Sequence, residues 1–210
     1  MRAVRPLLEI QGRWSRIPAA DQLLIERVKS REGHHLYFFP VEGRLVHEGL
    51  AALFAYRISR LVPISFTFSM NDYGIELLSP EQAPLEAALD AGLLSPHELL
   101  ADVTASLNAT EMAKRQFREI ARVAGLVFPG LPRSGKTARQ LQASSGLFFD
   151  VFTRYDPANL LVSQAHREVL ERQLESSRLG RTLERLSKAE VILTDPPRTP
   201  PLAFPLLVDR

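Results

Sequence analysis

The sequence predicts an α+β fold in which a small antiparallel sheet packs against a helical half. Short aromatic or alternating segments, which are typical of strands, dominate the first eighty residues. Apolar residues at helical spacing dominate the middle of the chain, and Val191–Thr194 supplies a late strand. We expect one domain, with a β-rich part over about 1–80 and 190–210 and a helical part over about 81–189.

The strands follow one another before the first long helix and after it. His35–Phe39 is short and aromatic, which favours a buried strand. Ile64–Met70 alternates apolar and polar residues, and the turn residues Asn71–Gly74 lead into a return strand at Ile75–Leu78. Leu23–Val28 is compatible with a strand or a short helix.

The helices are predicted from apolar stripes and from end signals. Arg44–Leu61 has apolar residues three and four positions apart. The acidic stretch 81–102 should hold one or two short helices, with Ser95 as an N-cap. Met112–Ala124 separates apolar and basic arcs and should end at Gly125. Further helices are predicted over Thr137–Phe152 and from Asp156 to about Lys188, the second with a break near Gly180.

Composition is that of an ordinary globular protein, but its charge is segregated. The 210 residues are 45% hydrophobic and 24% charged, with no cysteine and therefore no disulfide or thiolate metal site. No signal sequence and no apolar run of membrane-spanning length is present, so we expect a cytoplasmic protein without a membrane partner. Residues 61–110 carry seven acidic and no basic side chains, whereas residues 111–140 carry seven basic and two acidic ones.

The basic block predicts a nucleic-acid contact. Lys114, Arg118 and Arg122 recur every four residues on one helix face, and Arg115 flanks them. Such a face can neutralise phosphates, with an affinity that falls as salt rises. The simpler alternative is that this basic helix face is exposed to solvent and binds no ligand. The other candidate DNA-binding residues are Lys136, Arg139, Gln140, Arg44, His47 and Trp14, with Tyr37 and Tyr73 as further aromatic candidates for base stacking.

A P-loop pattern competes with this interpretation. Residues 130–137 match G-x-x-x-x-G-K-[ST] at every position. A working P-loop needs a buried strand before the loop and a helix after it, so that backbone N–H groups cradle phosphate. Only Leu126–Phe128 remains for that strand. A small P-loop NTPase using Lys136 and Thr137 is therefore the alternative function, and a basic surface loop is the simpler interpretation.

The histidines and serines do not predict a catalytic or metal site. His34 and His35 are neighbours on a strand, so their side chains point to opposite faces and cannot readily hold one ion. No acidic cluster completes a tetrahedral site. Ser144–Gly146 lacks the strand–turn–helix elbow that exposes a catalytic serine. We therefore expect no metal ligands and no catalytic residues.

Several long segments carry a resemblance to a known family. They are Gly33–Leu36 with Glu42–Leu53, Asn71–Gly74, Ala105–Ala113, Arg118–Val127, Ala138–Leu147, Arg154–Pro157 and Thr199–Leu206. In this order they resemble the C-terminal, DEAD/H-associated domain of the Lhr (large helicase-related) DExH-box helicases, most nearly the ligase-associated DNA-damage-response members. The resemblance covers nearly the whole chain.

The resemblance implies an accessory domain of an ATP-dependent 3′-to-5′ DNA helicase that acts in repair. In that family, ATP and Mg²⁺ bind to RecA-like domains upstream of everything in this chain, so we expect no cofactor here and we expect Met1 to begin a fragment or a separately encoded remnant. The implied partners are single-stranded DNA or an RNA:DNA hybrid, the RecA-like and winged-helix domains, and a DNA ligase and nuclease of the same pathway. A purely structural docking domain is the third hypothesis.

Overall fold

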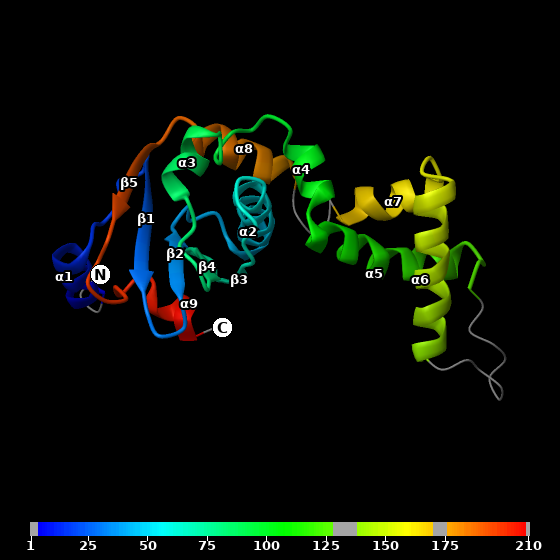
Figure 1. Ribbon diagram of the computed structural model, residues 1–210, viewed down its shortest axis with the longest axis horizontal. Coiled ribbons are helices and arrows are strands. Elements are labelled where there is room, and N and C mark those ends of the chain that lie inside the picture. The colour runs from blue at the N-terminus through cyan, green and yellow to red at the C-terminus, as the bar shows by residue number, and fades with distance from the viewer. Residues whose placement is uncertain (1–3, 128–137, 170–175, 209–210) are drawn as a thin grey trace. The chain divides into compact units, whose positions relative to one another are not determined.

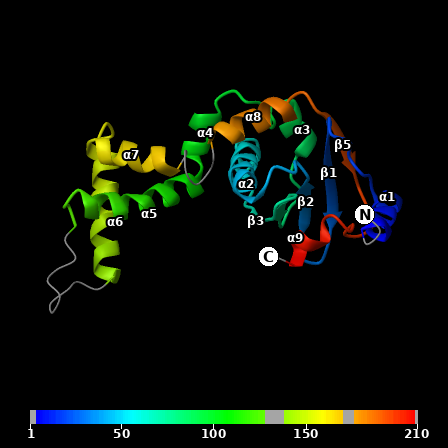
Figure 2. The same cartoon turned by 180° about the vertical axis from the view of Figure 1, so that it is seen from behind.

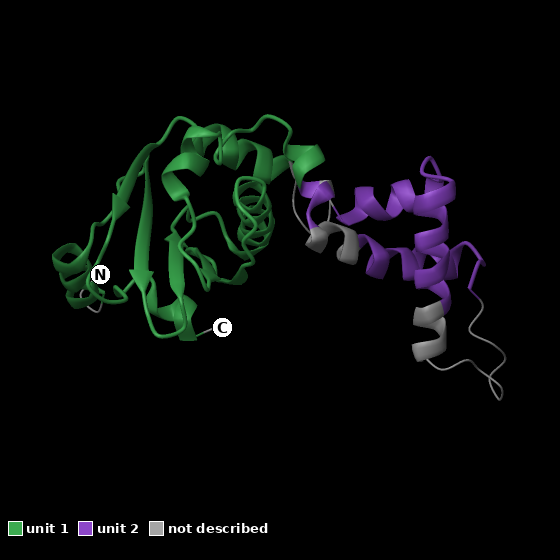
Figure 3. Cartoon of the chain, viewed as in Figure 1, with its two compact units in different colours: residues 1–102, 175–210 green, residues 103–174 purple. Residues whose placement is uncertain are grey.

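The computed structural model describes residues 4–127, 138–169 and 176–208 (Figure 1). The chain divides into two compact units, residues 1–102 with 175–210 and residues 103–174 (Figure 3). We call the first the sheet unit and the second the helical unit. The helical unit is thus an insertion within the sequence of the sheet unit.

The sheet unit is built on a five-stranded sheet in the order β3-β4-β2-β1-β5. Three of the pairings, β1–β2, β2–β4 and β3–β4, are antiparallel, and β1–β5 is parallel. The α+β class is confirmed. The antiparallel sheet of the prediction needs one correction at β5, which a long connection allows to run alongside β1 in the same direction. The strands are β1 Gln22–Lys29, β2 His34–Phe38, β3 Thr67–Met70, β4 Ile75–Ser79 and β5 Glu190–Thr194.

One face of the sheet packs on the long helix α2 (Arg44–Ser59). Leu50 and Leu53 are fully buried, and the ring of Phe54 lies 5.1 Å from that of Phe38 on β2. Burial of such side chains contributes about 1.5–3 kcal/mol each, so this apolar face holds α2 in place. Helices α3 (Leu85–Asp90) and α8 (Ser176–Leu186) pack on the same side, as Figure 1 and Figure 2 show from opposite directions.

The other face carries α1 (Arg5–Trp14) and α9 (Phe204–Val208). The sequence did not predict α1, and the segment that forms α9 had been assigned to the β-rich part. In α1 only Gln11 is buried, whereas Leu7, Leu8 and Ile10 are 37–39% exposed. The helix is therefore anchored through its polar residue and leaves its apolar residues uncovered.

A row of polar side chains crosses the sheet beneath these helices. Ser69, Glu76, Tyr37, Glu26 and Thr194 are register partners from β3 through to β5. The Ser69 hydroxyl lies 3.0 Å from Glu76 Oε2, and Glu26 Oε1 accepts a hydrogen bond of 2.8 Å from the side chain of Gln11. Both glutamates are fully buried. The pairing of strands that are distant in the sequence creates this row, so no local sequence pattern predicts it.

The helical unit consists of α5 (Leu107–Val123) packed against α6 (Ala138–Tyr155) and α7 (Leu160–Glu168). Phe117 of α5 lies edge-on to Phe149 and Phe152 of α6, with ring centroids 5.5 and 6.2 Å apart. Gly125 follows α5 with a φ of 72°, as predicted for a helix end. The short α4 (Leu99–Ala105) precedes α5.

Two predicted helix signals are wrong. Ser95 does not cap a helix, because α4 begins at Leu99; its hydroxyl instead accepts the N–H of His97. Gly180 lies inside α8 and does not break it. A Cβ at Gly180 would lie 3.7 Å from Leu99, so the helix passes close to its neighbour at that point.

Candidate nucleic-acid interface

The predicted basic stripe lies on α5, and half of it is already paired. Lys114 Nζ lies 2.7 Å from Asp150 on α6, and Arg122 lies 2.7 Å from Glu119. Both pairs are partly exposed, so they contribute little to stability. They do lower the positive charge that these two residues offer to a polyanion.

Arg115 and Arg118 are the stripe residues that no described side chain pairs with. Arg115 is exposed. Arg118 is half-buried, and its Nε is buried without an acceptor among the described residues. A buried guanidinium N–H is costly without an acceptor. These two guanidinium groups are therefore the members of the stripe that no described carboxylate pairs with, and Arg115 is the more accessible of the two.

The continuation of the basic block is only partly described. Lys136, like the rest of the 130–137 loop, lies outside the described residues, whereas Arg139 and Gln140 lie in the first turn of α6. Before the loop, Leu126 and Val127 form no strand; their N–H groups both donate to the Ala121 carbonyl at the end of α5. The described part of the chain thus does not supply the strand that a P-loop requires.

His47 is buried, and both of its ring nitrogens are engaged. Nε2 accepts the N–H of Glu42 at 3.0 Å, and Nδ1 donates to the carbonyl of Asn71 at 2.6 Å. Burial lowers the pKa of His47, against the opposing effect of its bond to Asn71. A neutral, enclosed imidazole cannot bind phosphate. His47 therefore joins two loops and is not available for contact with DNA.

Arg44, at the start of α2, keeps its exposed side chain. Its backbone N–H donates to Asp72 Oδ1 at 3.2 Å, and the N–H of Gly43 donates to the Asp72 carbonyl, also at 3.2 Å. Asp72 therefore satisfies the beginning of the helix. The Arg44 guanidinium has no partner among the described residues and remains available to a ligand.

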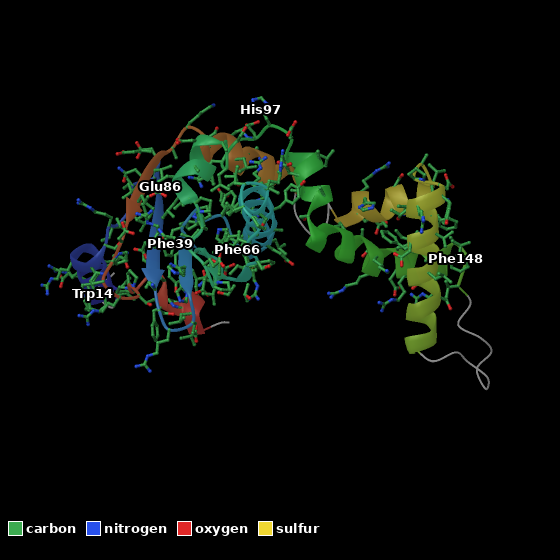
Figure 4. The ribbon with its side chains drawn as sticks, in the orientation of Figure 1. Trp14, Phe39, Phe66, Glu86, His97 and Phe148 are labelled. Atoms are coloured by element: carbon green, nitrogen blue, oxygen red, sulfur yellow. The ribbon has the colours of Figure 1, made fainter. Side chains whose placement is uncertain are left out.

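The three aromatic candidates differ in exposure. Tyr37 is fully buried in the polar row, so it cannot stack on a base. Trp14 is half-buried at the end of α1 (Figure 4). The guanidinium of Arg198 lies 4.7 Å from its ring centroid. Tyr73 is 67% exposed. Of the three, Tyr73 has the most freely accessible ring.

Comparison with known proteins identifies the family to which this fold belongs. Residues 17–203 match the model of the DEAD/H associated family. The chain belongs to that family. The match covers nearly all of both units, and it confirms the resemblance found in the sequence.

The similar proteins are Lhr helicases. The chain is 24% identical to the ATP-dependent helicase Lhr-Core of Methanocaldococcus jannaschii, over 99% of the chain and 24% of that protein. It is also 24% identical to Lhr-Core protein 2 of Thermococcus barophilus, over 79% of the chain and 19% of that protein. Its fold matches the helicase Lhr of Mycobacterium smegmatis, solved with ssDNA and AMP-PNP, with a TM-score of 0.78 and 21% identity over 98% of the chain and 26% of that one.

The present chain thus spans about a quarter of the length of these relatives. Within the described residues, no helix combines the length and the hydropathy that a membrane crossing requires.

Proposed function

We propose that this chain is an accessory domain of an Lhr-type ATP-dependent DNA helicase and that it engages single-stranded DNA, or the DNA strand of an RNA:DNA hybrid, in repair. Membership of the DEAD/H associated family supports the first part. The similarity to a helicase solved with ssDNA supports the second. The ATP-hydrolysing domains, and a DNA ligase and nuclease of the same pathway, are the partners that the family resemblance implies.

The observation that carries DNA engagement is the unpaired part of the α5 stripe. Arg115 and Arg118 present guanidinium groups that no described carboxylate neutralises. Guanidinium is weakly hydrated and matches phosphate geometry, so such groups bind a nucleic-acid backbone without regard to sequence. Lys114 and Arg122 would add to this face when DNA competes with their carboxylate partners. Lys136, Arg139 and Gln140 continue the same basic block along the chain.

The test is fluorescence anisotropy of the full chain with a labelled oligothymidylate at rising salt. Each phosphate contact adds about 0.7 to the slope of log affinity against log salt for single strands, so Arg115→Ala with Arg118→Ala should lower the slope by roughly 1 to 1.5. Arg5→Ala, which removes an 80% exposed arginine side chain from the sheet unit, is the matched control. An affinity that does not respond to salt would refute the proposal.

The exposed face of α1 favours a second role, docking onto another domain of the helicase. Leu7, Leu8 and Ile10 lie on a helix that buries only Gln11. These side chains, each 37–39% exposed within about one turn of helix, offer apolar surface to a partner. We expect Leu7→Ser with Leu8→Ser to reduce binding of the chain to an Lhr core made of RecA-like and winged-helix domains, measured by calorimetry. Unchanged binding would remove α1 from the interface.

A further inference from the structure

Two loops of the sheet unit meet at the start of α2. They are residues 40–45, which lead from β2 into the first turn of α2, and residues 71–74, between β3 and β4; together we call them the corner. Two hydrogen bonds join them, from the N–H groups of Gly43 and Arg44 to the carbonyl and the carboxylate of Asp72. Because Tyr73 follows Asp72, the side chains of Arg44 and Tyr73 leave from adjoining stretches of backbone.

The corner is held rigidly from within. His47 bridges its two loops through Glu42 and Asn71, at 3.0 and 2.6 Å. The side chain of Asn71 accepts the N–H groups of Tyr73 and Gly74 at 2.9 and 3.0 Å. A Cβ at Gly74 would lie 2.8 Å from the Phe38 carbonyl, so the turn sits tightly against the end of β2. The backbone that carries Tyr73 is therefore fixed before any ligand arrives.

The acidic group of the 40–45 loop is neutralised by α8. Arg185 Nη2 lies 3.0 Å from the Glu42 carboxylate and donates to the Pro40 carbonyl at 2.7 Å, and Arg178 lies 3.9 Å from the same carboxylate. Asp72 accepts the N–H of Arg44 through Oδ1 and keeps its negative charge. The Glu42 carboxylate of the corner is thus paired with α8, and the exposed guanidinium of Arg44 has no partner among the described residues.

The side chains that the corner presents are aromatic, apolar and cationic. Tyr73 is 67% exposed, Val41 60% and Leu45 46%. Val41 adopts a φ of 55°, which is strained for a β-branched residue and needs the surrounding hydrogen bonds to hold it. None of these exposed side chains contributes to the buried core. The stability of the fold therefore does not explain why they occur on this well-ordered stretch of backbone.

We propose that the corner is a second nucleic-acid contact, at which Tyr73 stacks on an unpaired base and Arg44 binds a neighbouring phosphate. Single-strand binders combine exposed aromatic rings with cations along the backbone, and stacking tolerates any base because every base has a π-face. Val41 and Leu45 would form an apolar rim beside the stacked base. The inference rests on the proposed function, but it involves the sheet unit rather than α5.

The experiment measures affinity of the full chain for a labelled oligothymidylate and for a matched abasic strand. Tyr73→Ala should weaken binding to the oligothymidylate roughly 5- to 140-fold, the range for loss of one stacked base. Tyr73→Phe should restore it, because the ring suffices. Arg44→Ala should weaken binding to both strands and lower the slope of log affinity against log salt by about 0.7. Tyr155→Ala is the matched control, since Tyr155 is 73% exposed in the helical unit.

Each outcome has a distinct meaning. A loss with Tyr73→Ala that is recovered by Phe and absent on the abasic strand supports stacking at the corner. Salt-dependent binding that Tyr73→Ala leaves unchanged overturns the corner while the α5 proposal stands, and so does an equal loss in Tyr155→Ala. If the unsubstituted chain binds neither strand, both proposals fail. Because Tyr73 is mostly exposed, its substitutions should leave the unfolding midpoint unchanged, which circular dichroism checks.

Discussion

The guanidinium of Arg57 donates to the carboxylate of Asp102 across 2.8 Å, and the two side chains are only 9% and 8% exposed. The same guanidinium donates to the carbonyls of Leu93, Ser95 and His97 at 2.7–3.0 Å. A single side chain of α2 thus holds the loop that leads into α4. Arg57 lies in the last turn of α2, where a basic side chain is commonly exposed, but here it acts as an internal clamp.

Replacing Arg57 should be among the most damaging changes in the sheet unit. Arg57→Ala leaves the buried Asp102 carboxylate with only the more distant Arg60 as its cation and removes the donor from several carbonyls, so we expect the free energy of unfolding to fall by about 3–5 kcal/mol. Urea unfolding measures this. Arg60→Ala is the control, because Arg60 reaches the same carboxylate at 3.3 Å with a 56% exposed side chain and should cost less than about 1 kcal/mol. Similar losses in both variants would contradict the clamp.

Substitutions of two glycines compare the cost of backbone strain at two turns, with and without a close neighbour. Gly33 has a φ of 144°, and a Cβ there would lie 2.4 Å from the Ser79 carbonyl, whereas a Cβ at Gly125, with a φ of 72°, would meet nothing within 4 Å. Gly33→Ala should cost roughly 3 kcal/mol from strain and overlap, and Gly125→Ala only about 1 kcal/mol from backbone strain. Thermal unfolding of the two variants compares them, and equal shifts would show that the contact with β4 is not what requires Gly33.

The sequence predicted the elements whose side chains follow the usual burial rule. The apolar stripe that defined α2 is buried, as shown by Val46, Leu50 and Phe54. Of the alternating segment Ile64–Met70 only Thr67–Met70 forms β3, and there the polar Ser69 is the buried residue. Helix α1 was not predicted, although Leu7, Ile10 and Trp14 follow helical spacing and Pro6 lies in its first turn. Its burial could not have been predicted, because the residue that it buries is the polar Gln11.

The site was harder to predict because its properties depend on contacts between distant residues. Helical spacing placed Lys114, Arg118 and Arg122 on one stripe, but spacing along α5 says nothing of Asp150, which pairs with Lys114 from another helix. The sequence placed His47 near a helix start, either bonded locally or facing a phosphate, and only the structure shows that Asn71, on a separate loop, accepts its Nδ1–H. Charge segregation along the chain located the basic block; only the tertiary structure distinguishes its free cations from its paired ones.

Glu26 should make the protein less stable as pH rises. Burial raises the pKa of Glu26 above its ordinary value of 4.5, although Ser15 and Gln11 partly oppose this through hydrogen bonds. The folded chain therefore binds the proton more tightly than the unfolded chain, and stability falls as pH rises from 4.5 through the folded pKa. Glu26→Gln removes this titration, so its stability relative to the unsubstituted chain should increase with pH.

Urea unfolding of Glu26→Gln and the unsubstituted chain across this pH range measures the difference directly, because all other groups titrate in both. Glu9→Gln, at a carboxylate that is 53% exposed, is the control for the loss of one negative charge. A difference that stays constant across pH for Glu26→Gln would mean that the folded state does not favour the protonated carboxyl.

Releasing the paired cations of α5 should strengthen DNA binding. Glu119→Gln frees Arg122 and Asp150→Asn frees Lys114, each now held at 2.7 Å. Because both pairs are partly exposed, each change should alter the free energy of unfolding by less than about 1 kcal/mol. Each freed cation should raise the salt slope of oligothymidylate binding by up to about 0.7. Glu184→Gln on α8 changes the net charge equally and serves as the control. If Glu184→Gln gave the same gain, net charge rather than the α5 stripe would govern affinity, whereas a gain confined to the two α5 partners would place the phosphate contacts on that helix.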